Sequence, residues 1–281
     1  MPLAFEFDAA TALSRGERTY QEDAVVTDFA NGAEMGFAVL ADGMGGHAAG
    51  DVASKIVVSE VYSELMFHKG DVASFEAVVR DRLHDAAMNA NACLKDHVLS
   101  FPETRGMGAT LVASVVLGSK LYWISIGDSP LFLFRDGVLK QLNEDHSMAP
   151  QIDFMVRSGL LAPEDGEKHP DRNTLTSVLA GSDVAKIDCP ADPLVLQHDD
   201  ILIVASDGLQ FLSDDDIETA LRKAGTQQST AIVDLLLRQV FELEDPELDN
   251  VSFSVVKVKQ RRSEAAPSSE AMAPPDMRRV G

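Results

Sequence analysis

The chain has 281 residues, 45% of them hydrophobic, and carries 45 acidic against 24 basic side chains, a formal net charge of −21. This length and composition predict one soluble globular domain, and the charge argues against binding to nucleic acid or to an anionic membrane surface. A dianionic ligand would also be repelled unless cations lay between it and the carboxylates.

Cys93 and Cys189 are the only cysteines, and their spacing is typical of neither a zinc site nor a disulfide framework. We therefore expect two free thiols, as is usual in the cytosol. Residues 1–12 lack a basic segment followed by an apolar run, so no signal peptide is expected. Because no apolar stretch approaches the roughly 20 residues that span a bilayer, the sequence predicts a cytoplasmic protein.

The first half of the chain predicts two strands, then helices, then a run of short strands. Asn31-Gly32 forms the expected turn between the first two strands, and Gly70-Asp71 separates two segments whose apolar residues recur at helical spacing. The short β-rich runs that follow lie too close together for crossover helices, so we expect an antiparallel meander. The predicted segments are 24–29, 35–41, 56–65, 74–94, 110–117, 120–126, 131–135 and 138–142.

The second half predicts a loop-rich excursion and then the rest of the sheet and its helices. Residues 144–181 are polar and broken by prolines, and such surface segments often carry specificity. From about Gln260 the Ser-, Pro- and Ala-rich tail is expected to be disordered. Strands before and after a helical pair, without strict alternation, predict an α+β fold of antiparallel sheets covered by helices. The remaining predicted elements are a short helix near 151–158, strands at 201–206 and 251–258, and helices at 214–224 and 229–243.

Acidic residues stand at the ends of several predicted strands. Segments 37–46 and 201–210 echo each other, because each is an apolar strand that ends in Asp-Gly. A carboxylate there is held on a rigid element, and glycine lets the backbone turn or approach a ligand closely. If these strand ends converge, the carboxylates repel one another, so divalent cations are natural partners, and oxygen-only ligands favour Mg²⁺ or Mn²⁺. The acids are Glu22, Asp23, Asp42, Asp128, Asp207 and Asp249.

Each of these motifs also has an ordinary structural explanation. Asp-Gly after a strand is more often a hairpin turn than a metal site. Glu22-Asp23 could form a solvated strand edge, and Asp128 could cap a turn. The order and context of the acids, taken together, favour the functional interpretation. The glycine-rich run 43–50 is only a weak candidate for phosphate binding, because it lacks the lysine of a P-loop.

Eight motifs occur in order between Arg15 and Lys257: RTYQED (18–23), VLADGMGGHAAG (39–50), GMGATL (106–111), IGDSPLFLFRDG (126–137), NEDHS (143–147), HPDRNTLTSVL (169–179), ASDGL (205–209) and DNVS (249–252). In this order they resemble the metal-dependent Ser/Thr protein phosphatases of type 2C, in their bacterial form. The resemblance implies two packed antiparallel β-sheets flanked by helices, an α-β-β-α sandwich. It also implies a catalytic domain at 1–259 with a flap-like excursion at about 144–181, followed by the tail at 260–281.

The resemblance further implies roles in a first metal site. Asp42 would bridge two metals and therefore act in catalysis. Gly43 would offer its backbone carbonyl to one of them. Asp207 and Asp249 would complete the first site.

Other residues would hold further ions and the substrate. Asp23 would hold the second ion, directly or through water, with Glu22 nearby. Asp128, sharing Asp207, would help to hold a third and weaker ion. Arg18 matches the catalytic, substrate-binding arginine that grips the phosphate, since a planar guanidinium suits phosphate oxygens. The ordinary alternative for Arg18 is a surface ion pair.

Some positions depart from the family pattern. Met44 stands where eukaryotic members have a histidine proposed as general acid, so the proton for the leaving group would come from elsewhere. Pro130 and Ser177 replace basic residues, which puts the substrate contacts of their two loops in doubt. His47 and His146 lie in matched motifs, and we expect them to make structural hydrogen bonds rather than to act in catalysis.

These residues predict hydrolysis of phosphoserine and phosphothreonine in proteins by a water that bridges two divalent cations, reversing a Ser/Thr protein kinase. Two or three Mn²⁺ or Mg²⁺ ions per chain are expected. The expected partners are phosphorylated proteins and a cognate kinase, and the chain is expected to be a cytoplasmic monomer that binds neither nucleic acid nor membrane. Three alternatives remain: an inactive phosphoprotein-binding homologue, a related phosphatase for a phosphorylated regulator domain, and a two-metal nuclease or phosphodiesterase.

Overall fold

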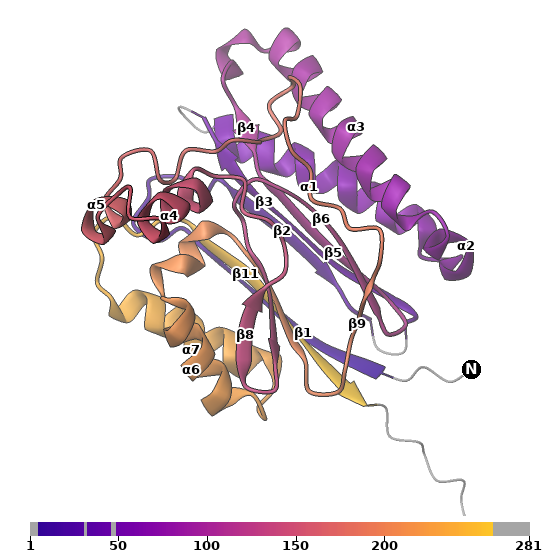
Figure 1. The fold of residues 1–281 in the computed structure, drawn as a ribbon. Helices are drawn as coiled ribbons and strands as arrows, with labels where there is room; N and C mark the ends of the chain where they lie inside the picture. Colours follow the sequence, from indigo (N-terminus) through magenta and orange to yellow (C-terminus); the bar gives the residue numbers. More distant parts are fainter. Residues whose placement is uncertain (1–4, 31–32, 46–48, 261–281) are drawn as a thin grey trace, which may run out of the picture.

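The structure is a computed structural model that describes residues 5–30, 33–45 and 49–260. Two antiparallel β-sheets lie face to face, and helices cover the outer face of each (Figure 1). This arrangement confirms the predicted α+β sandwich. Apolar side chains form three cores, one between the sheets and one beneath each helical layer.

The first sheet contains, in spatial order, β2 (Asp23–Asp28), β3 (Met35–Met44), β5 (Leu111–Leu117), β6 (Lys120–Ile126) and β9 (Leu194–Val195), with β4 (Gly108–Ala109) paired to β3. Successive side chains of β3 point to opposite faces. Phe37, Val39 and Ala41 pack toward the helices, whereas Ala38 and Leu40 face the other sheet. Because both faces are buried, the strand reads as a continuous apolar run.

The second sheet contains, in spatial order, β1 (Phe5–Ser14), β11 (Val251–Gln260), β10 (Ile201–Ala205), β7 (Leu131–Arg135) and β8 (Val138–Gln141). The sequence did not predict β1, because the segment FEFDAATALS is rich in alanine and poor in β-branched residues. Its pairing with β11 runs the full length of both strands, from Phe5 opposite Gln260 to Ser14 opposite Val251. Long-range pairing therefore makes a strand of a segment with weak local preference.

Two groups of helices cover the sheets. On the first sheet lie α1 (Ala49–His68), α2 (Val72–Glu76) and α3 (Val79–Ser100), and on the second lie α6 (Asp214–Ala224) and α7 (Ser229–Glu242). The predicted helix at 74–94 is thus two helices. The excursion carries α4 (Ala149–Arg157), which the sequence predicted near 151–158. It also carries a second helix, α5 (Pro163–Glu167), which the sequence did not predict. Short 3₁₀ turns occupy Pro102–Thr104 and Asp207–Phe211.

The predicted single meander is wrong at one turn. β5 pairs with β6 in the first sheet, but β7 and β8 pair in the second, so the chain changes sheets between Ile126 and Leu131. Gly127 makes this change with φ of +105°, and a Cβ there would lie 2.6 Å from Thr110 Cγ2. Turn length alone cannot distinguish such a crossing from a hairpin.

Some sequence predictions fall near or beyond the limits of the described residues. β11 runs through Gln260, one residue past the expected domain end at 259. Asn31-Gly32, His47 and residues 261–281 lie outside the described ranges. Both cysteines are free, as expected. Within the described part of the chain, no helix is long and apolar enough to cross a membrane.

Candidate active site

Acids from both sheets meet at one end of the sandwich. Asp23 and Asp42 are direct partners in the β2–β3 pair, Asp128 follows β6, Asp207 follows β10, and Asp249 precedes β11. They surround a cavity of about 470 Å³, here called the mouth, although Asp23 lies behind its wall and is only 3% exposed. The mouth is lined by Arg18, Glu22, Asp42, Gly43, Met44, Gly45, Thr110, Asp128, Asn173, Leu175, Val178, Asp207, Asp249 and Asn250.

The main chain of Asp42 is fixed on both sides by Thr110. The N–H of Asp42 donates to Thr110 Oγ1 at 2.9 Å, and the N–H of Thr110 donates to the Asp42 carbonyl at 2.8 Å. Thr110 Oγ1 also lies 2.7 Å from Ser129 Oγ, next to Asp128. One threonine therefore connects the segments that carry two of the acids.

The backbone of Gly43 lies in close contact with the backbones of Glu22 and Gly50. Its N–H donates to the Glu22 carbonyl at 3.1 Å. A Cβ at Gly43 would lie 2.0 Å from the Gly50 carbonyl oxygen and 2.5 Å from that of Glu22. Only glycine permits this approach, which brings Glu22 against the N-terminus of α1.

Burial and mutual repulsion raise the pKa values of five carboxyl groups at the mouth, those of Glu22, Asp23, Asp42, Asp128 and Asp207. The pKa of Asp42 lies well above its usual range, first because of burial and then because of the charges of Asp23 and Asp207. Burial, with the charge of Asp207, raises the pKa of Asp128 to about 7. Burial also raises the pKa of Asp23 to about 7, although hydrogen bonds to that carboxyl oppose the rise.

Three buried carboxylate oxygens of this cluster, Glu22 Oε1, Asp23 Oδ1 and Asp207 Oδ1, have no hydrogen-bond partner. A buried charge without a partner is costly, so these oxygens require protons or cations. The acids offer oxygen donors, which suit Mg²⁺ or Mn²⁺ better than zinc. The residues present therefore fit divalent cations in charge and in donor chemistry.

Asp249 is already engaged through both oxygens. Arg18 Nη2 donates to Oδ2 at 2.6 Å, and the N–H of Asn250 donates to Oδ1 at 2.7 Å. The Arg18 side chain is 56% exposed. Among the described residues, no group of three or more His, Cys, Asp or Glu side chains is placed so that it could hold a metal ion as it stands. The structure thus gathers the predicted residues around one mouth, with Asp23 buried behind its lining. Arg18 forms an ion pair with Asp249, which is the alternative considered for it.

Sequence reasoning gave no role to two residues that hold the mouth together. Asn250 is buried, and its Oδ1 accepts the N–H of Glu22 at 2.6 Å. Its Nδ2 donates to the carbonyls of Arg15 and Tyr20 at 2.8 and 2.9 Å. Asn250 and Thr110 both stand in the matched motifs, DNVS and GMGATL, so the motifs signalled their importance without showing their hydrogen bonds.

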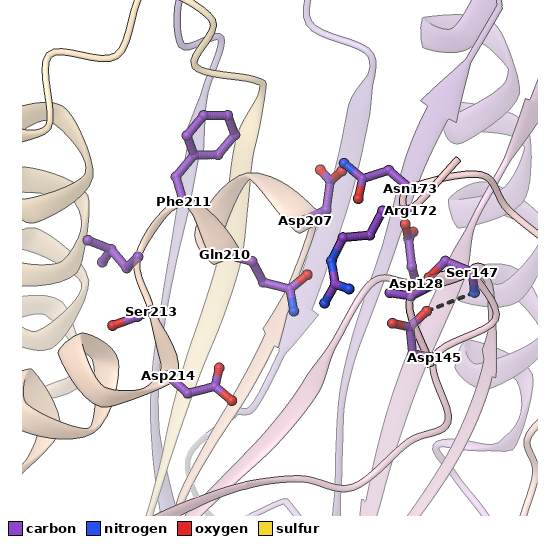
Figure 2. A pocket seen from close by; sticks show the side chains of 12 residues that line it. Asp128, Asp145, Ser147, Arg172, Asn173, Asp207, Gln210, Phe211, Ser213 and Asp214 are labelled. Carbon is purple, nitrogen blue, oxygen red and sulfur yellow. Dashed lines mark hydrogen bonds between the residues drawn. The ribbon is translucent and has the colours of Figure 1, made fainter. Parts of the chain in front are cut away.

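A second cavity of about 450 Å³ adjoins the mouth and shares Asp128, Asn173 and Asp207 with it. In Figure 2, the Arg172 side chain reaches from the excursion into this space between Asp145 and the 3₁₀ turn after β10. Arg172 is paired with Asp153 of α4 at 2.7 and 3.4 Å. No motif spacing predicted this cavity, because its walls come from segments far apart in sequence.

The positions that depart from the family pattern are explained by local packing. Pro130 is buried and its carbonyl accepts the N–H of Ala205 at 3.0 Å. Ser177 is 3% exposed and exchanges hydrogen bonds of 2.7 and 3.0 Å with the main chain of Lys186. Neither residue lines the mouth, whereas Met44 does.

His146 has a structural hydrogen bond, as expected. Its Nδ1 accepts the N–H of Gly127 at 3.3 Å, and the side chain is 1% exposed. Burial lowers the pKa of His146, which favours the neutral ring.

A family model described as protein phosphatase 2C matches residues 14–247. A curated protein phosphatase 2C-type relative from Streptococcus pyogenes is 31% identical over 207 residues, covering 73% of this chain and 80% of the relative. The serine/threonine phosphatase stp of Listeria monocytogenes is 31% identical over 206 residues, covering 73% and 79%. The crystal structure of the catalytic domain of the serine/threonine protein phosphatase PstP, in complex with two manganese ions, aligns with a TM-score of 0.67 and 28% identity, over 91% of this chain and 100% of that one. The matched residues 14–247 include every acid of the mouth except Asp249.

Proposed function

Because this chain belongs to the protein phosphatase 2C family, we propose that its mouth hydrolyses phosphoserine and phosphothreonine in proteins with divalent cations bound. The observation that carries the proposal is the set of buried carboxylate oxygens without partners beside an exposed arginine. A phosphate dianion would be repelled by such a mouth unless cations were bound there. The PstP structure holds two manganese ions.

The central metal ligands in this proposal are those of the strand ends. Asp42 would be a ligand of two ions, and the backbone carbonyl of Gly43 would be a ligand of one of them. Asp207 and Asp249 complete the first site. Thr110 fixes the main chain of Asp42, so the backbone that carries this carboxylate is in place before an ion binds.

The remaining acids serve further ions. Asp23 and Glu22, each with a buried unpaired oxygen, hold the second. Asp128, with Asp207, holds a third, for a total of two or three Mn²⁺ or Mg²⁺ per chain. When bound, the cations supply a water of lowered pKa as nucleophile and neutralise charge on the phosphoryl oxygens.

Arg18 binds the substrate phosphate in this proposal. Its side chain is exposed and lines the mouth, so it can exchange Asp249 for a phosphate oxygen. Met44 has no ionisable group, so it cannot protonate the leaving alkoxide. Because two hydrogen bonds to Thr110 hold the main chain of Asp42, the backbone that carries this carboxylate needs little reorganisation during the reaction.

The proposed partners follow from the activity. Phosphorylated proteins are the substrates, and a cognate Ser/Thr protein kinase supplies them, in cytoplasmic signalling by a monomer. The charge of −21 disfavours nucleic acid and anionic membranes as partners. In this proposal the catalytic domain extends through Gln260, where β11 ends.

A direct assay tests the proposal. Hydrolysis of p-nitrophenyl phosphate and of a phosphothreonine peptide is measured with Mn²⁺, with Mg²⁺ and with chelator. We expect turnover with either metal, at least as fast with Mn²⁺, and none with chelator. Asp42→Asn should be inactive, while Asp192→Asn, at an exposed site away from the mouth, should match the wild type. Full turnover after exhaustive chelation would overturn the proposal, and phosphopeptide binding without turnover would favour the inactive homologue.

A further inference from the structure

His146 lies at the base of the excursion, next to the turn that carries Asp128. Two hydrogen bonds of opposite direction join it to Gly127: the Gly127 N–H donates to His146 Nδ1 at 3.3 Å, and the His146 N–H donates to the Gly127 carbonyl at 3.0 Å. Both the ring and the main chain of His146 therefore hold the residue that directly precedes Asp128.

Gly127 has little freedom to move away from this contact. Its φ of +105° is a conformation that favours glycine. On the side of Thr110, a Cβ at Gly127 would lie 2.6 Å from the Thr110 Cγ2 atom. The turn before Asp128 is thus confined between His146 and the threonine that also fixes Asp42.

The main chain of His146 also holds the returning segment of the excursion, near Thr176. Its carbonyl accepts the Thr176 N–H at 2.7 Å and the Thr176 hydroxyl at 2.8 Å. Ser147 and Leu175 form a β-bridge beside it. Leu175 and Val178, on either side of Thr176, line the mouth.

The hydrogen bond to Nδ1 fixes the tautomer of the ring. Because Nδ1 accepts, the proton of the neutral imidazole lies on Nε2. Nε2 is buried without a hydrogen-bond partner, and the Glu144 carboxylate oxygen lies 3.8 Å away. A buried donor without a partner is costly. The hydrogen bond from the Gly127 N–H to Nδ1 therefore favours this placement of the ring, whereas Nε2 does not.

From this geometry we propose that His146 is a positioning residue. It holds Asp128 in place at the mouth and connects it to segment 175–178, which contributes Leu175 and Val178 to the lining of the mouth. The inference rests on the proposed metal role of Asp128. It assigns the imidazole a task in metal binding although the ring does not itself contact an ion. Hydrogen-bond partners of this kind commonly change metal affinity by about 10- to 100-fold when removed.

A matched pair of amides tests it. The Oδ1 of Asn can replace Nδ1 as acceptor for the Gly127 N–H, whereas the longer Gln side chain places its polar group near the position of Nε2. We expect calorimetric titration with Mn²⁺ alone to show the weakest ion bound about 10- to 100-fold less tightly in His146→Gln. His146→Asn should stay within about threefold of the wild type.

The Asp128→Asn variant is the reference that distinguishes the proposed metal role of Asp128 from the proposed positioning role of His146. If Asp128→Asn leaves Mn²⁺ binding unchanged, the metal role of Asp128 fails, and the inference fails with it. If Asp128→Asn weakens the last ion and His146→Gln does not, only the positioning role fails. Equal weakening in the Asn and Gln variants, in step with equal losses of thermal stability, would also overturn it, since simple packing would then explain both.

The wild-type protein gives an answer that needs no variant to fold. Long-range ¹⁵N–¹H correlation of the His146 ring should show the proton on Nε2, and the Gly127 amide should exchange slowly. A proton on Nδ1, or rapid exchange of that amide in the folded protein, would exclude the hydrogen bond and with it the proposal.

Discussion

Arg18 Nη2 donates to Asp249 Oδ2 at 2.6 Å, and this ion pair joins the proposed phosphate ligand to a proposed metal ligand 231 residues away in sequence. The other oxygen of Asp249 accepts the Asn250 N–H. A cation that uses Asp249 therefore competes with the guanidinium for Oδ2. The two proposed functions of the mouth, metal binding and phosphate binding, are coupled through this contact.

Arg18→Ala should therefore affect the two functions in opposite directions. Loss of a charge-assisted hydrogen bond to phosphate should lower kcat/KM by roughly ten- to a hundredfold, about 1.5–3 kcal/mol, mainly through KM. Mn²⁺ should bind more tightly, by up to about fivefold, because an exposed ion pair contributes up to about 1 kcal/mol. Steady-state kinetics across a Mn²⁺ titration, with calorimetry of the ion alone, measure both effects.

A neighbouring arginine provides the control. Arg15 is exposed, and within the described part of the chain its side chain donates to the Thr19 carbonyl and does not line the mouth, so Arg15→Ala should leave both constants unchanged. Unchanged kcat/KM in Arg18→Ala would reduce Arg18 to a surface ion pair. Weaker Mn²⁺ binding in Arg18→Ala would contradict the competition for Asp249.

Gly43→Ala should disrupt the mouth because the added methyl group would collide with neighbouring backbone. The added methyl would lie 2.0 Å from the Gly50 carbonyl oxygen and 2.5 Å from that of Glu22, and neither can rotate away as a side chain would. We expect a loss of about 1–3 kcal/mol or more in the free energy of unfolding, with weaker Mn²⁺ binding. Denaturant titration should show Gly70→Ala, where nothing lies within 4 Å, within about 0.5 kcal/mol of the wild type. Equal stability of the two variants would contradict the crowding.

The parts of this fold that the sequence predicted are those where a local pattern decides the structure. The strand before Asp207 is an apolar run that stops at a turn, and both features are local. The strand that carries Asp42 is also an apolar run, but it continues through Met44, past the predicted end at Asp42-Gly43, because β4 pairs with Gly43 and Met44. The helices at Asp214–Ala224 and Ser229–Glu242 are similarly amphipathic. These elements also place most of the acids of the mouth.

The parts that the sequence did not predict depend on partners far along the chain. β1 is a strand because β11 pairs with it, and the change of sheet at Gly127 depends on packing against Thr110. Residue type likewise did not show that Asn250 holds Glu22, or that Asp249 holds Arg18. Such contacts are decided by tertiary geometry, which composition and periodicity do not encode.

Truncation after Gln260 should leave hydrolysis of p-nitrophenyl phosphate within about twofold of the full-length rate. This cut keeps β11 whole, and the composition of residues 261–281 offers little apolar surface to bury. Truncation after Val255 is the informative contrast, because it removes half of the pairing with β1 and should abolish folding. A large fall in kcat for the first truncation would place the tail in the catalytic domain.

Asp42→Asn should abolish hydrolysis while stabilising the metal-free protein at pH 8. Burial and the charges of Asp23 and Asp207 raise the pKa of Asp42, so its ionised form is unfavourable in the folded state without cations. We expect kcat at saturating Mn²⁺ to fall on the order of 10²- to 10³-fold or more, and the melting temperature in chelator to rise. A lower melting temperature in chelator would indicate that Asp42 is a structural hydrogen-bonding residue instead.

The stability of the metal-free protein should also depend on pH through Asp128. Its pKa of about 7 in the folded state lies above the usual aspartate pKa of 3.8, so between about pH 4 and 7 the folded state binds more protons than the unfolded state. The stability from this group is therefore fully present at low pH and is lost as pH rises toward 7. The buried His146, whose pKa is lowered, contributes in the opposite direction.

Comparison with Asp128→Asn isolates the carboxyl group, because His146 and the other titrating groups are present in both proteins. In chelator, the melting temperature of Asp128→Asn minus that of the wild type should increase from pH 5 to pH 8. Asp192→Asn should show no such trend. With saturating Mn²⁺ the difference should shrink or reverse, since the wild type then gains a bound cation at Asp128 that the variant lacks. A difference that stays constant with pH in chelator would show that Asp128 is already ionised at pH 5, and that repulsion within the mouth is not what cations relieve.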